Sequence, residues 1–394
     1  MNKLILCFLF LTFSLRSKPL DVKVTAQSAI VMNADTGAIL YEKHPHIPRY
    51  PASITKVATA LFVLEQKKPN LGQLVIVPAE ALKIKPAGQN VDCPAYWGAV
   101  DGTKMGLVKG ETLSFESLLH GLMMVSGNDA ANTIAASLSD SIPHFMGELN
   151  EYLRSIGCVN TQFRNPHGLH HDEHFTTAYD MCLITKRALQ MPKFREIVSK
   201  IVYQKPKTNK HPAEEIRHTN PLLKPGKHYY SKAIGVKTGT GYNSQSVANT
   251  IVAAAEHEGR TLIAVLLGCP KGGDRYKDAI RLFEAAFAEE KATRCLLGSE
   301  EPFSREITGA KGPLRASLGT PLEISFYPAE EPSCKAALHW DPVRLPIRKG
   351  QKVGEVRVHT EEGKLLQKGD LFAAAPVEGT FFFVLKEKFS NIFR

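Results

Sequence analysis

A serine and a lysine three positions apart lie at the start of a strongly apolar segment of this chain. Residues 49–64 read RYPASITKVATALFVL, so that Ser53 and Lys56 are polar residues at the start of a mostly apolar run. The three- and four-residue spacing of the apolar residues after Pro51 predicts a buried helix. Ser53 and Lys56 then lie on the same face of that helix, one turn apart.

This pair has a specific chemistry if the helix is buried. A buried ammonium is costly without a partner, and a lowered pKa leaves instead a neutral amine that accepts protons. Such an amine next to the Ser53 hydroxyl makes the serine a nucleophile, and the helix start offers backbone N–H groups to an oxyanion. In the alternative interpretation Ser53 is only a helix cap and Lys56 extends from the helix flank to solvent. The pair alone leaves both interpretations open.

Two further short motifs follow downstream. Ser126 and Asn128 come after an apolar helical segment, and a Lys-Thr-Gly-Thr run lies in a strand-like segment. The members of that run are Lys237, Thr238, Gly239 and Thr240. Taken alone, Ser126 is explained as a helix cap and Lys237 as a charge on an edge strand. The ordered set of three motifs is far rarer than any one of them.

The segments around these motifs predict an α+β domain. Residues 27–43 are typical of a strand hairpin turning at Asp35-Thr36-Gly37, and strand-like runs return after residue 233. The other predicted strands are 234–237, 245–253 and 261–267, and the predicted helices are 114–124, 129–138, 145–156, 176–190 and 274–290. We expect the first hairpin to join the later sheet.

The segments before and after this domain have different sequence patterns. Lys3 followed by the apolar run 4–15 predicts an export signal over residues 1–20, too short to be a permanent membrane span. After Cys295, alternating segments at 322–326, 337–340 and 355–359 predict a separate β domain over residues 295–376.

The last segment, residues 377–394, is predicted to be an amphipathic helix. Its aromatic and aliphatic side consists of Phe382, Leu385, Phe389, Ile392 and Phe393. A basic, aromatic-rich helix of this kind is typical of a membrane-surface anchor. The alternative is that it packs on the β domain.

Composition excludes some classes of protein. The formal charge is +10, but the lysines and arginines are dispersed without a nucleic-acid-binding module, so nucleic acid is not an expected partner. Anionic lipid or wall polymer suits an exported basic protein better. Cys7 lies in the predicted signal, and the other six cysteines form no Cys-x-x-Cys pair, so neither zinc nor redox chemistry is indicated.

The three ordered motifs resemble those of active-site serine penicillin-recognising enzymes. The middle motif, Ser126-Gly127-Asn128, is similar to that of the low-molecular-mass penicillin-binding proteins, the serine-type D-alanyl-D-alanine carboxypeptidases. The segments 33–41 (NADTGAILY) and 163–169 (FRNPHGL) extend the resemblance. It implies a transpeptidase/β-lactamase-like domain over residues 21–294, with an antiparallel sheet flanked by helices and a helical subdomain. A small all-β sandwich and the anchoring helix then follow.

The resemblance also implies roles for the motif residues. Ser53 would attack the penultimate D-Ala carbonyl of a peptidoglycan stem peptide, with Lys56 as general base. Ser126 would relay a proton to the leaving amine, and Asn128 would position Lys56 and the substrate. The oxyanion would lie between the backbone N–H groups of Ser53 and Thr240.

The substrate carboxylate would be bound by the third motif. Lys237 supplies a cation and the Thr238 and Thr240 hydroxyls supply donors, while Gly239 keeps the strand open. A further basic residue is expected after the next strand, and the sequence leaves Lys271 and Arg275 equally open. β-Lactams are expected inhibitors, no metal or cofactor is required, and the expected location is periplasmic, on the outer face of the cytoplasmic membrane.

Several alternatives stay open on the same motifs. A class A β-lactamase needs a Glu-x-x-Leu-Asn pattern, but Met146 stands where that glutamate would precede Leu149-Asn150. A DD-endopeptidase and a β-lactam sensor that acylates without turnover share the remaining features. Four histidines could in principle bind zinc, although the Pro and Gly between them favour a loop: His167, His170, His171 and His174.

Overall fold

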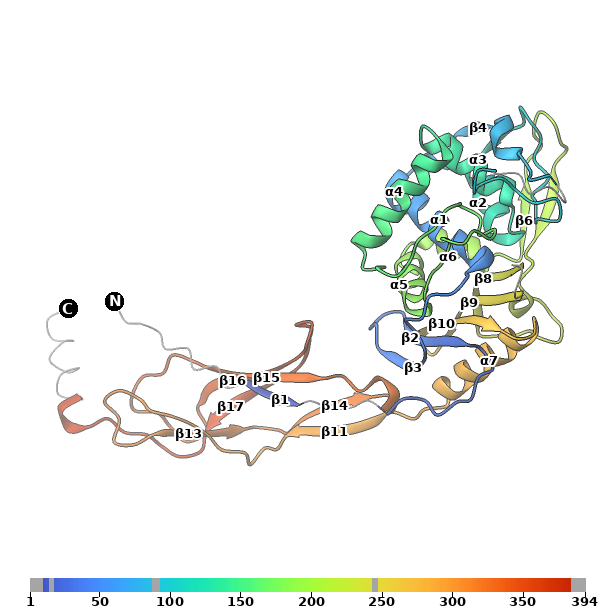
Figure 1. Ribbon diagram of the computed structural model, residues 1–394. Coiled ribbons are helices and arrows are strands. Elements are labelled where there is room, and N and C mark those ends of the chain that lie inside the picture. Colours follow the sequence, from blue (N-terminus) through green and yellow to red (C-terminus); the bar gives the residue numbers. More distant parts are fainter. Residues whose placement is uncertain (1–9, 14–17, 87–92, 243–246, 384–394) are drawn as a thin grey trace, which may run out of the picture. The chain divides into compact units, whose positions relative to one another are not determined.

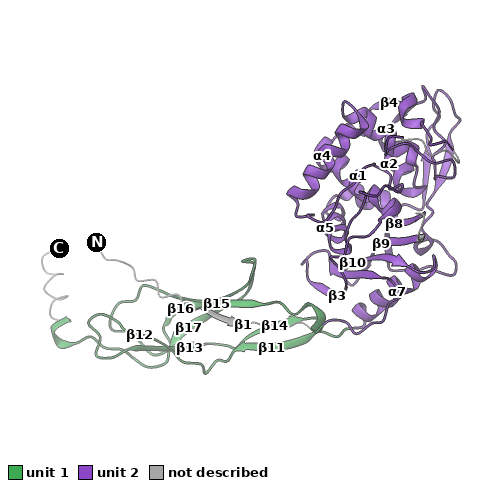
Figure 2. Cartoon of the chain, in the orientation of Figure 1, with its two compact units in different colours: residues 1–18, 289–394 green, residues 19–288 purple. Residues whose placement is uncertain are grey.

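The computed structural model describes residues 10–13, 18–86, 93–242 and 247–383. The chain divides into two compact units (Figure 2): unit 2 is residues 19–288, and unit 1 combines residues 289–394 with residues 1–18. The boundary predicted between residues 294 and 295 falls inside strand β11 (Ala292–Leu297) of unit 1.

Unit 2 is built on a five-stranded antiparallel sheet with the strand order β3-β2-β10-β9-β8 (Figure 1). The N-terminal hairpin joins the later strands through β2, in which Met32 pairs with Ile263 of β10. This confirms the predicted α+β arrangement. The strands are β2 (Ser28–Asn33), β3 (Ile39–Lys43), β8 (Ala233–Tyr242), β9 (Val247–His257) and β10 (Arg260–Cys269).

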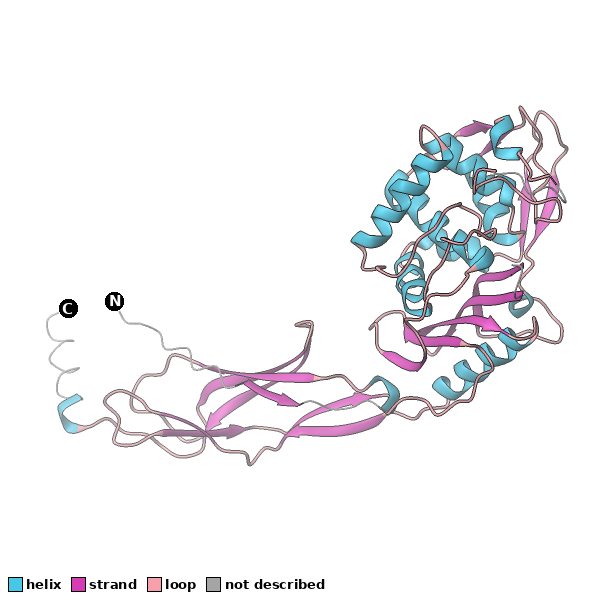
Figure 3. Ribbon diagram, viewed as in Figure 1, coloured by secondary structure: helices cyan, strands magenta, loops and turns pink. Residues whose placement is uncertain are grey.

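Helices cover both faces of this sheet (Figure 3). α7 packs on β9 and β10 from one face, while α5 and α6 contact β2, β10 and β8 from the other. The helices are α1 (Thr55–Phe62), α2 (Phe115–Met124), α3 (Asn128–Leu138), α4 (Ile142–Ser155), α5 (Ala178–Leu189), α6 (Pro192–Ser199) and α7 (Asp274–Phe287).

The predicted helices are present, with small shifts at their ends. Ser114 caps α2 by accepting from the backbone N–H of Ser117, as its position before the apolar run predicted. α4 starts three residues earlier than the predicted 145, because Ser141 caps it and Pro143 fits its first turn. The predicted continuous helix after Pro51 is divided: a 3₁₀ turn (Ala52–Ile54) precedes α1, and a π turn (Val63–Lys67) follows it.

Short elements complete unit 2. The predicted polar stretch after α1 contains β4 (Leu74–Ile76), which pairs with β5 (Thr112–Ser114), and a 3₁₀ turn (Ala79–Leu82). A second small hairpin, β6 (Val202–Lys205) with β7 (Glu214–Arg217), and a 3₁₀ turn (Pro221–Leu223) lead to β8.

α1 lies at the centre of the hydrophobic core of unit 2. All eight of its residues are buried, and its apolar side chains belong to one cluster with those of α2, α3, α4 and α5. Lys56 is therefore one of the largest fully buried side chains of the described chain. The periodicity after Pro51 predicted this burial correctly.

Unit 1 is built mainly from β-strands, as expected, with a 3₁₀ turn (Pro328–Glu330) before β15 and a helical turn at residues 381–383. Its larger sheet has the order β1-β15-β16-β17-β13-β12, and β11 pairs with β14. Besides β11 the strands are β1 (Phe10–Phe13), β12 (Phe303–Arg305), β13 (Leu314–Leu318), β14 (Leu322–Phe326), β15 (Cys334–Trp340), β16 (Lys352–Thr360) and β17 (Leu365–Ala373). The three predicted strands fall within β14, β15 and β16.

The predictions for the two ends of the chain concern residues that are largely outside the description. Within the predicted signal, only β1 and residues 18–20 are described, and β1 pairs with β15. Residues 384–394, most of the predicted anchor, lie outside the described residues. Among the described helices, none has the length and apolar character needed to cross a membrane.

Candidate active site

Ser53 lies in the tight 3₁₀ turn that leads into α1. Ala52 before it has a left-handed φ of 53°. The loop after α4 approaches this turn so closely that a Cβ on Gly168, itself at φ +92°, would stand 2.0 Å from the Ala52 carbonyl oxygen. The turn is also tied to the sheet, because the Thr250 hydroxyl donates to the Pro51 carbonyl at 2.8 Å. Only glycine at position 168 permits this packing.

The side chain of Lys56 reaches Ser53 from one turn further along. Lys56 Nζ is 3.2 Å from Ser53 Oγ, 2.8 Å from Asn128 Oδ1 and 2.6 Å from the carbonyl oxygen of His167. A neutral amine has two N–H groups, and the amide and carbonyl oxygens accept both. The nitrogen lone pair is then left for the Ser53 hydroxyl.

The electrostatics favour the neutral amine. Burial lowers the pKa of Lys56 well below its ordinary value, and the charge of Lys237 lowers it further, while the charge of Asp129 raises it by less. A lysine with a lowered pKa is suited to act as a general base at neutral pH.

The second motif is placed by the junction of α2 and α3. Ser126 adopts a left-handed φ of 62°, and its carbonyl accepts from the Thr103 hydroxyl at 2.7 Å. The Asp129 carboxylate accepts the backbone N–H groups of Met105, Gly106 and Leu107 at 2.8–3.0 Å. The loop at residues 103–107 and the start of α3 are thus held together beside Lys56. Within the described chain, the buried Ser126 Oγ has no hydrogen-bond partner, which leaves it available to a bound molecule.

The third motif lies on β8, the strand at one end of the sheet. A Cβ on Gly239 would stand 2.3 Å from Thr250 Oγ1 and 3.1 Å from the backbone nitrogen of Ser53. The absence of a side chain therefore lets β8 pass directly beside the turn that contains Ser53. Lys237 is buried, and its Nζ donates to the Thr238 carbonyl at 2.8 Å. Burial, with a smaller contribution from Arg275, lowers the pKa of Lys237 to about 7.

The structure distinguishes the two basic residues that the sequence left open. Arg275, at the start of α7, is buried, and its Nη1 lies 2.9 Å from Thr240 Oγ1 and also bonds to the Gly239 carbonyl. Lys271 is exposed. Arg275 is thus the residue that joins the Lys-Thr-Gly-Thr motif.

Two histidines of the histidine-rich segment, His167 and His174, have both ring nitrogens engaged in hydrogen bonds within the protein. His167 Nδ1 accepts the backbone N–H of Leu169, and Nε2 is 2.9 Å from the Tyr96 carbonyl, so both ring nitrogens are paired with backbone. His174 is similarly paired with the Arg164 N–H and the Thr55 hydroxyl. These contacts fix the loop whose His167 carbonyl accepts from Lys56. Sequence reasoning missed this carbonyl, because a main-chain acceptor has no residue-type signature.

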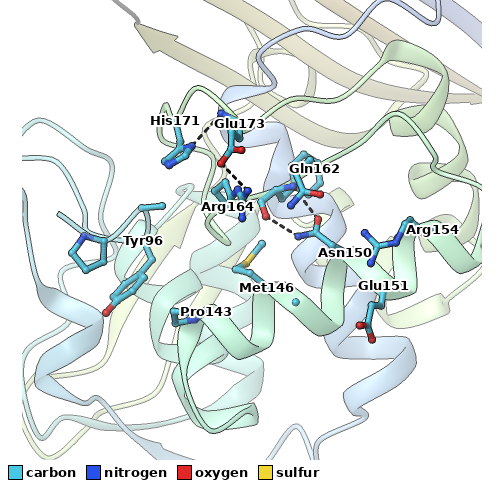
Figure 4. Close-up of a pocket in the computed structure, with 14 residues that line it drawn as sticks. Tyr96, Pro143, Met146, Asn150, Glu151, Arg154, Gln162, Arg164, His171 and Glu173 are labelled. Carbon is cyan, nitrogen blue, oxygen red and sulfur yellow. Dashed lines mark hydrogen bonds and ion pairs between the residues drawn. The ribbon is translucent and has the colours of Figure 1, made fainter. Parts of the chain in front are cut away.

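A cavity of about 490 Å³ lies beside the same loop (Figure 4). Asn150 of α4 lies in its wall. The Asn150 side-chain amide donates to the Phe163 carbonyl at 2.8 Å and accepts from the Phe163 N–H at 2.9 Å. Met146 lines the cavity as an apolar side chain at the position where a class A β-lactamase has its glutamate. Ser53 and Lys56 are not among its lining residues.

Fold and site together define a penicillin-recognising serine hydrolase. A profile of the D-alanyl-D-alanine carboxypeptidases matches residues 14–271. The chain therefore belongs to the D-alanyl-D-alanine carboxypeptidase family of serine peptidases, family S11.

Individual relatives agree with this assignment. The chain is 28% identical over 359 residues to D-alanyl-D-alanine carboxypeptidase DacA of Haemophilus influenzae, covering 89% of this chain and 84% of that protein. It is 26% identical over 356 residues to DacF of Bacillus subtilis, with the same coverage. The crystal structure of penicillin-binding protein 5 from Haemophilus influenzae is similar with a TM-score of 0.60 and 26% identity, over 91% of this chain and 98% of that one.

Proposed function

We propose that this enzyme removes the terminal D-alanine from peptidoglycan stem peptides that end in D-Ala-D-Ala, through an acyl-enzyme on Ser53. The observation that carries the proposal is the position of Lys56, whose Nζ lies 3.2 Å from Ser53 Oγ with its other hydrogen bonds directed to Asn128 and His167. This arrangement leaves a buried base and a nucleophile facing each other.

In the acylation step Ser53 Oγ bonds to the penultimate D-Ala carbonyl carbon, and its proton passes to Lys56. The oxyanion is held by the backbone N–H groups of Ser53 and Thr240, on the two segments that Gly239 allows to meet. The C–N bond then breaks as the leaving D-alanine nitrogen takes a proton relayed through Ser126. Water attacks the acyl-enzyme, with the proton again accepted by Lys56, and restores Ser53.

The substrate carboxylate is placed by the cations of the third motif. Arg275 is buried beside Thr240, and Lys237 is buried on the same strand, close enough to Arg275 for the two charges to interact. A carboxylate that binds between them compensates their positive charge. The Thr238 and Thr240 hydroxyls are the remaining donors. A free carboxylate at the end of the peptide is what distinguishes a carboxypeptidase substrate from an internal peptide bond.

The alternatives on the same fold receive less support. Met146 supplies no base for a deacylating water, which a class A β-lactamase needs. The family and the relatives are carboxypeptidases, not sensors or endopeptidases. We therefore expect penicillins to acylate Ser53 and to be released slowly.

The location is part of the proposal. Export by residues 1–20 would place the enzyme in the periplasm, where its substrate lies, and the aromatic, basic segment 377–394 would hold it at the outer face of the cytoplasmic membrane. Membrane fractionation of cells that express the chain with and without residues 377–394 tests this. Recovery of both forms in the soluble fraction would contradict the anchor.

The activity is tested with the purified protein and its Ser53→Ala variant. Both are incubated with a pentapeptide ending in D-Ala-D-Ala, and free D-alanine is measured. Release by the parent alone is expected. Labelling of the parent by a fluorescent penicillin without any D-alanine release would instead favour a sensor or a different target bond.

A further inference from the structure

One buried histidine of unit 2, His120, is not part of the active site described above. His120 on α2 is fully buried, and neither of its ring nitrogens has a hydrogen-bond partner in the described part of the chain. Its ring is stacked on Tyr203, with centroids 3.8 Å apart. Buried polar groups are normally hydrogen-bonded, so an imidazole with both nitrogens free calls for a ligand.

Two carboxylates converge on the same point. Glu116 lies one turn before His120 on the same face of α2, and Glu196 comes from α6, which packs against α2. One possible ligand atom from each of the three residues lies within 4.8 Å of the others. Within the described ranges, this is the one such group of three acidic, histidine or cysteine side chains. Glu196 is exposed, which gives the group an entry path from solvent.

From this geometry we infer that Glu116, His120 and Glu196 form a binding site for a divalent transition metal of the zinc class. One imidazole nitrogen and two carboxylate oxygens are ligands that suit zinc, and water would complete a four-coordinate shell. Tetrahedral coordination with bonds near 2.1 Å requires donors about 3.4 Å apart. The ligand atoms now lie within 4.8 Å of one another, so the two glutamates must rotate towards His120 when the metal binds.

A cation already bridges the two carboxylates. Lys193 Nζ is 2.5 Å from Glu116 Oε1 and 2.9 Å from Glu196 Oε2, and Lys200 Nζ is 3.3 Å from the other oxygen of Glu196. A metal must displace the Lys193 ammonium from this position. Metal affinity is therefore limited by Lys193, and removing that lysine should increase it.

The imidazole is ready to bind a metal. Burial, with the charge of Lys200 as the next contribution, lowers the pKa of His120 to about 4. The ring is then neutral at neutral pH, the form in which histidine ligates metals.

The site would connect two helices that support the active site. α2 ends at Met124, just before Ser126, and α6 packs on β8, where Val198 O lies 2.9 Å from the Cβ position of Gly235. A metal that binds only the folded protein stabilises it by mass action. The expected role is therefore a structural clip between α2 and α6.

The experiment uses the metal-free full chain titrated with zinc chloride by calorimetry. Cobalt chloride absorption reports the coordination geometry, and thermal unfolding is followed with and without zinc. We expect one equivalent to bind the parent and to raise its unfolding temperature. Lys193→Met should bind at least about tenfold more tightly. His120→Phe keeps an aromatic ring against Tyr203 without a ligand atom, and it should weaken binding at least about tenfold.

Two controls make the test decisive. Glu196→Gln changes an exposed side chain and should weaken binding even if His120→Phe does not fold. His144→Asn removes a different surface pair, in which His144 Nδ1 is 3.5 Å from Asp140, and should leave binding unchanged. Absence of binding to both the parent and Lys193→Met, or binding that is unaffected by His120→Phe and Glu196→Gln, would overturn the inference. The group would then be only a lysine-bridged ion-pair network.

Discussion

The Lys56 amine lies 2.8 Å from Oδ1 of Asn128, a neutral side chain that accepts a hydrogen bond without adding charge. An aspartate would fit the same space and accept the same bond. Its negative charge, however, would favour the protonated form of Lys56. An amide at position 128, unlike a carboxylate, therefore favours the neutral form of Lys56, as its proposed role as general base requires.

Asn128→Asp is predicted to raise the pKa of Lys56 and so to move the acidic limb of kcat/KM upward by about 1 to 3 pH units. The sign follows because the base acts only when unprotonated, and a raised pKa makes that form available only at higher pH. The measurement is the pH profile of D-alanine release. Asn128→Ala should lower kcat/KM by loss of positioning, but its acidic limb should not move upward. An unchanged profile for Asn128→Asp would argue against Lys56 as the base.

Gly239→Ala is predicted to lower kcat/KM by roughly 100-fold. The new Cβ would stand 2.3 Å from Thr250 Oγ1, 3.0 Å from the Pro51 carbonyl oxygen and 3.1 Å from the Ser53 nitrogen. Thr250 is itself held by its bond to Pro51, so β8 must move away from the turn that contains Ser53. That movement separates the backbone N–H groups of Ser53 and Thr240, the proposed oxyanion donors. The rate of acylation by a chromogenic β-lactam reports the same loss, and near-parental acylation would show that the turn accommodates the methyl group.

The same substitution at a glycine within a helix should raise stability and leave activity unchanged. Gly147 is exposed in the middle of α4, and no atom lies within 4 Å of its Cβ position. Gly147→Ala is therefore expected to stabilise the protein by about 0.5 to 1 kcal/mol, because alanine loses less conformational freedom in a helix. Urea unfolding measures the change, and D-alanine release should stay at the parental rate. Destabilisation would mean that α4 is less regular at this point than described.

The sequence was sufficient for the parts of the site that depend on local pattern. Apolar periodicity placed Lys56 in a buried helix, and the spacing of Ser53 and Lys56 brought them together, as the structure confirms. The hairpin at 27–43 was predictable because both of its strands and its turn are contiguous.

Features that depend on distant segments were not predictable. Lys271 and Arg275 are both basic, and only the packing of α7 against the sheet decides that Arg275 is the buried one. α6 was missed because it is eight residues long with few apolar positions, and β7 because Glu-Glu-Ile-Arg shows no clear alternation. The His167 carbonyl was missed because its role depends on a loop fold, not on a side chain.

His167 leads to a prediction about stability and pH. Burial lowers the pKa of His167 from 6.5 to about 3 in the folded protein. The unfolded chain therefore binds a proton below pH 6.5 that the folded protein does not bind until about pH 3. The stabilising contribution is complete above pH 6.5 and is lost as the pH falls from 6.5 towards 3, at up to about 1.4 kcal/mol per pH unit.

His167→Asn is predicted to flatten this dependence. The variant should be less stable at pH 7.5, since the bonds to Tyr96 and Leu169 are disturbed, but it should lose stability less steeply on acidification. Urea unfolding between pH 4.5 and 7.5 gives the slope of the unfolding free energy against pH. This slope should decrease by close to the contribution of one proton. Gly147→Ala, on α4 and without a titratable side chain, is the control and should keep the parental slope. A His167→Asn slope equal to that of the parent would show that the folded protein accommodates the charged His167 ring.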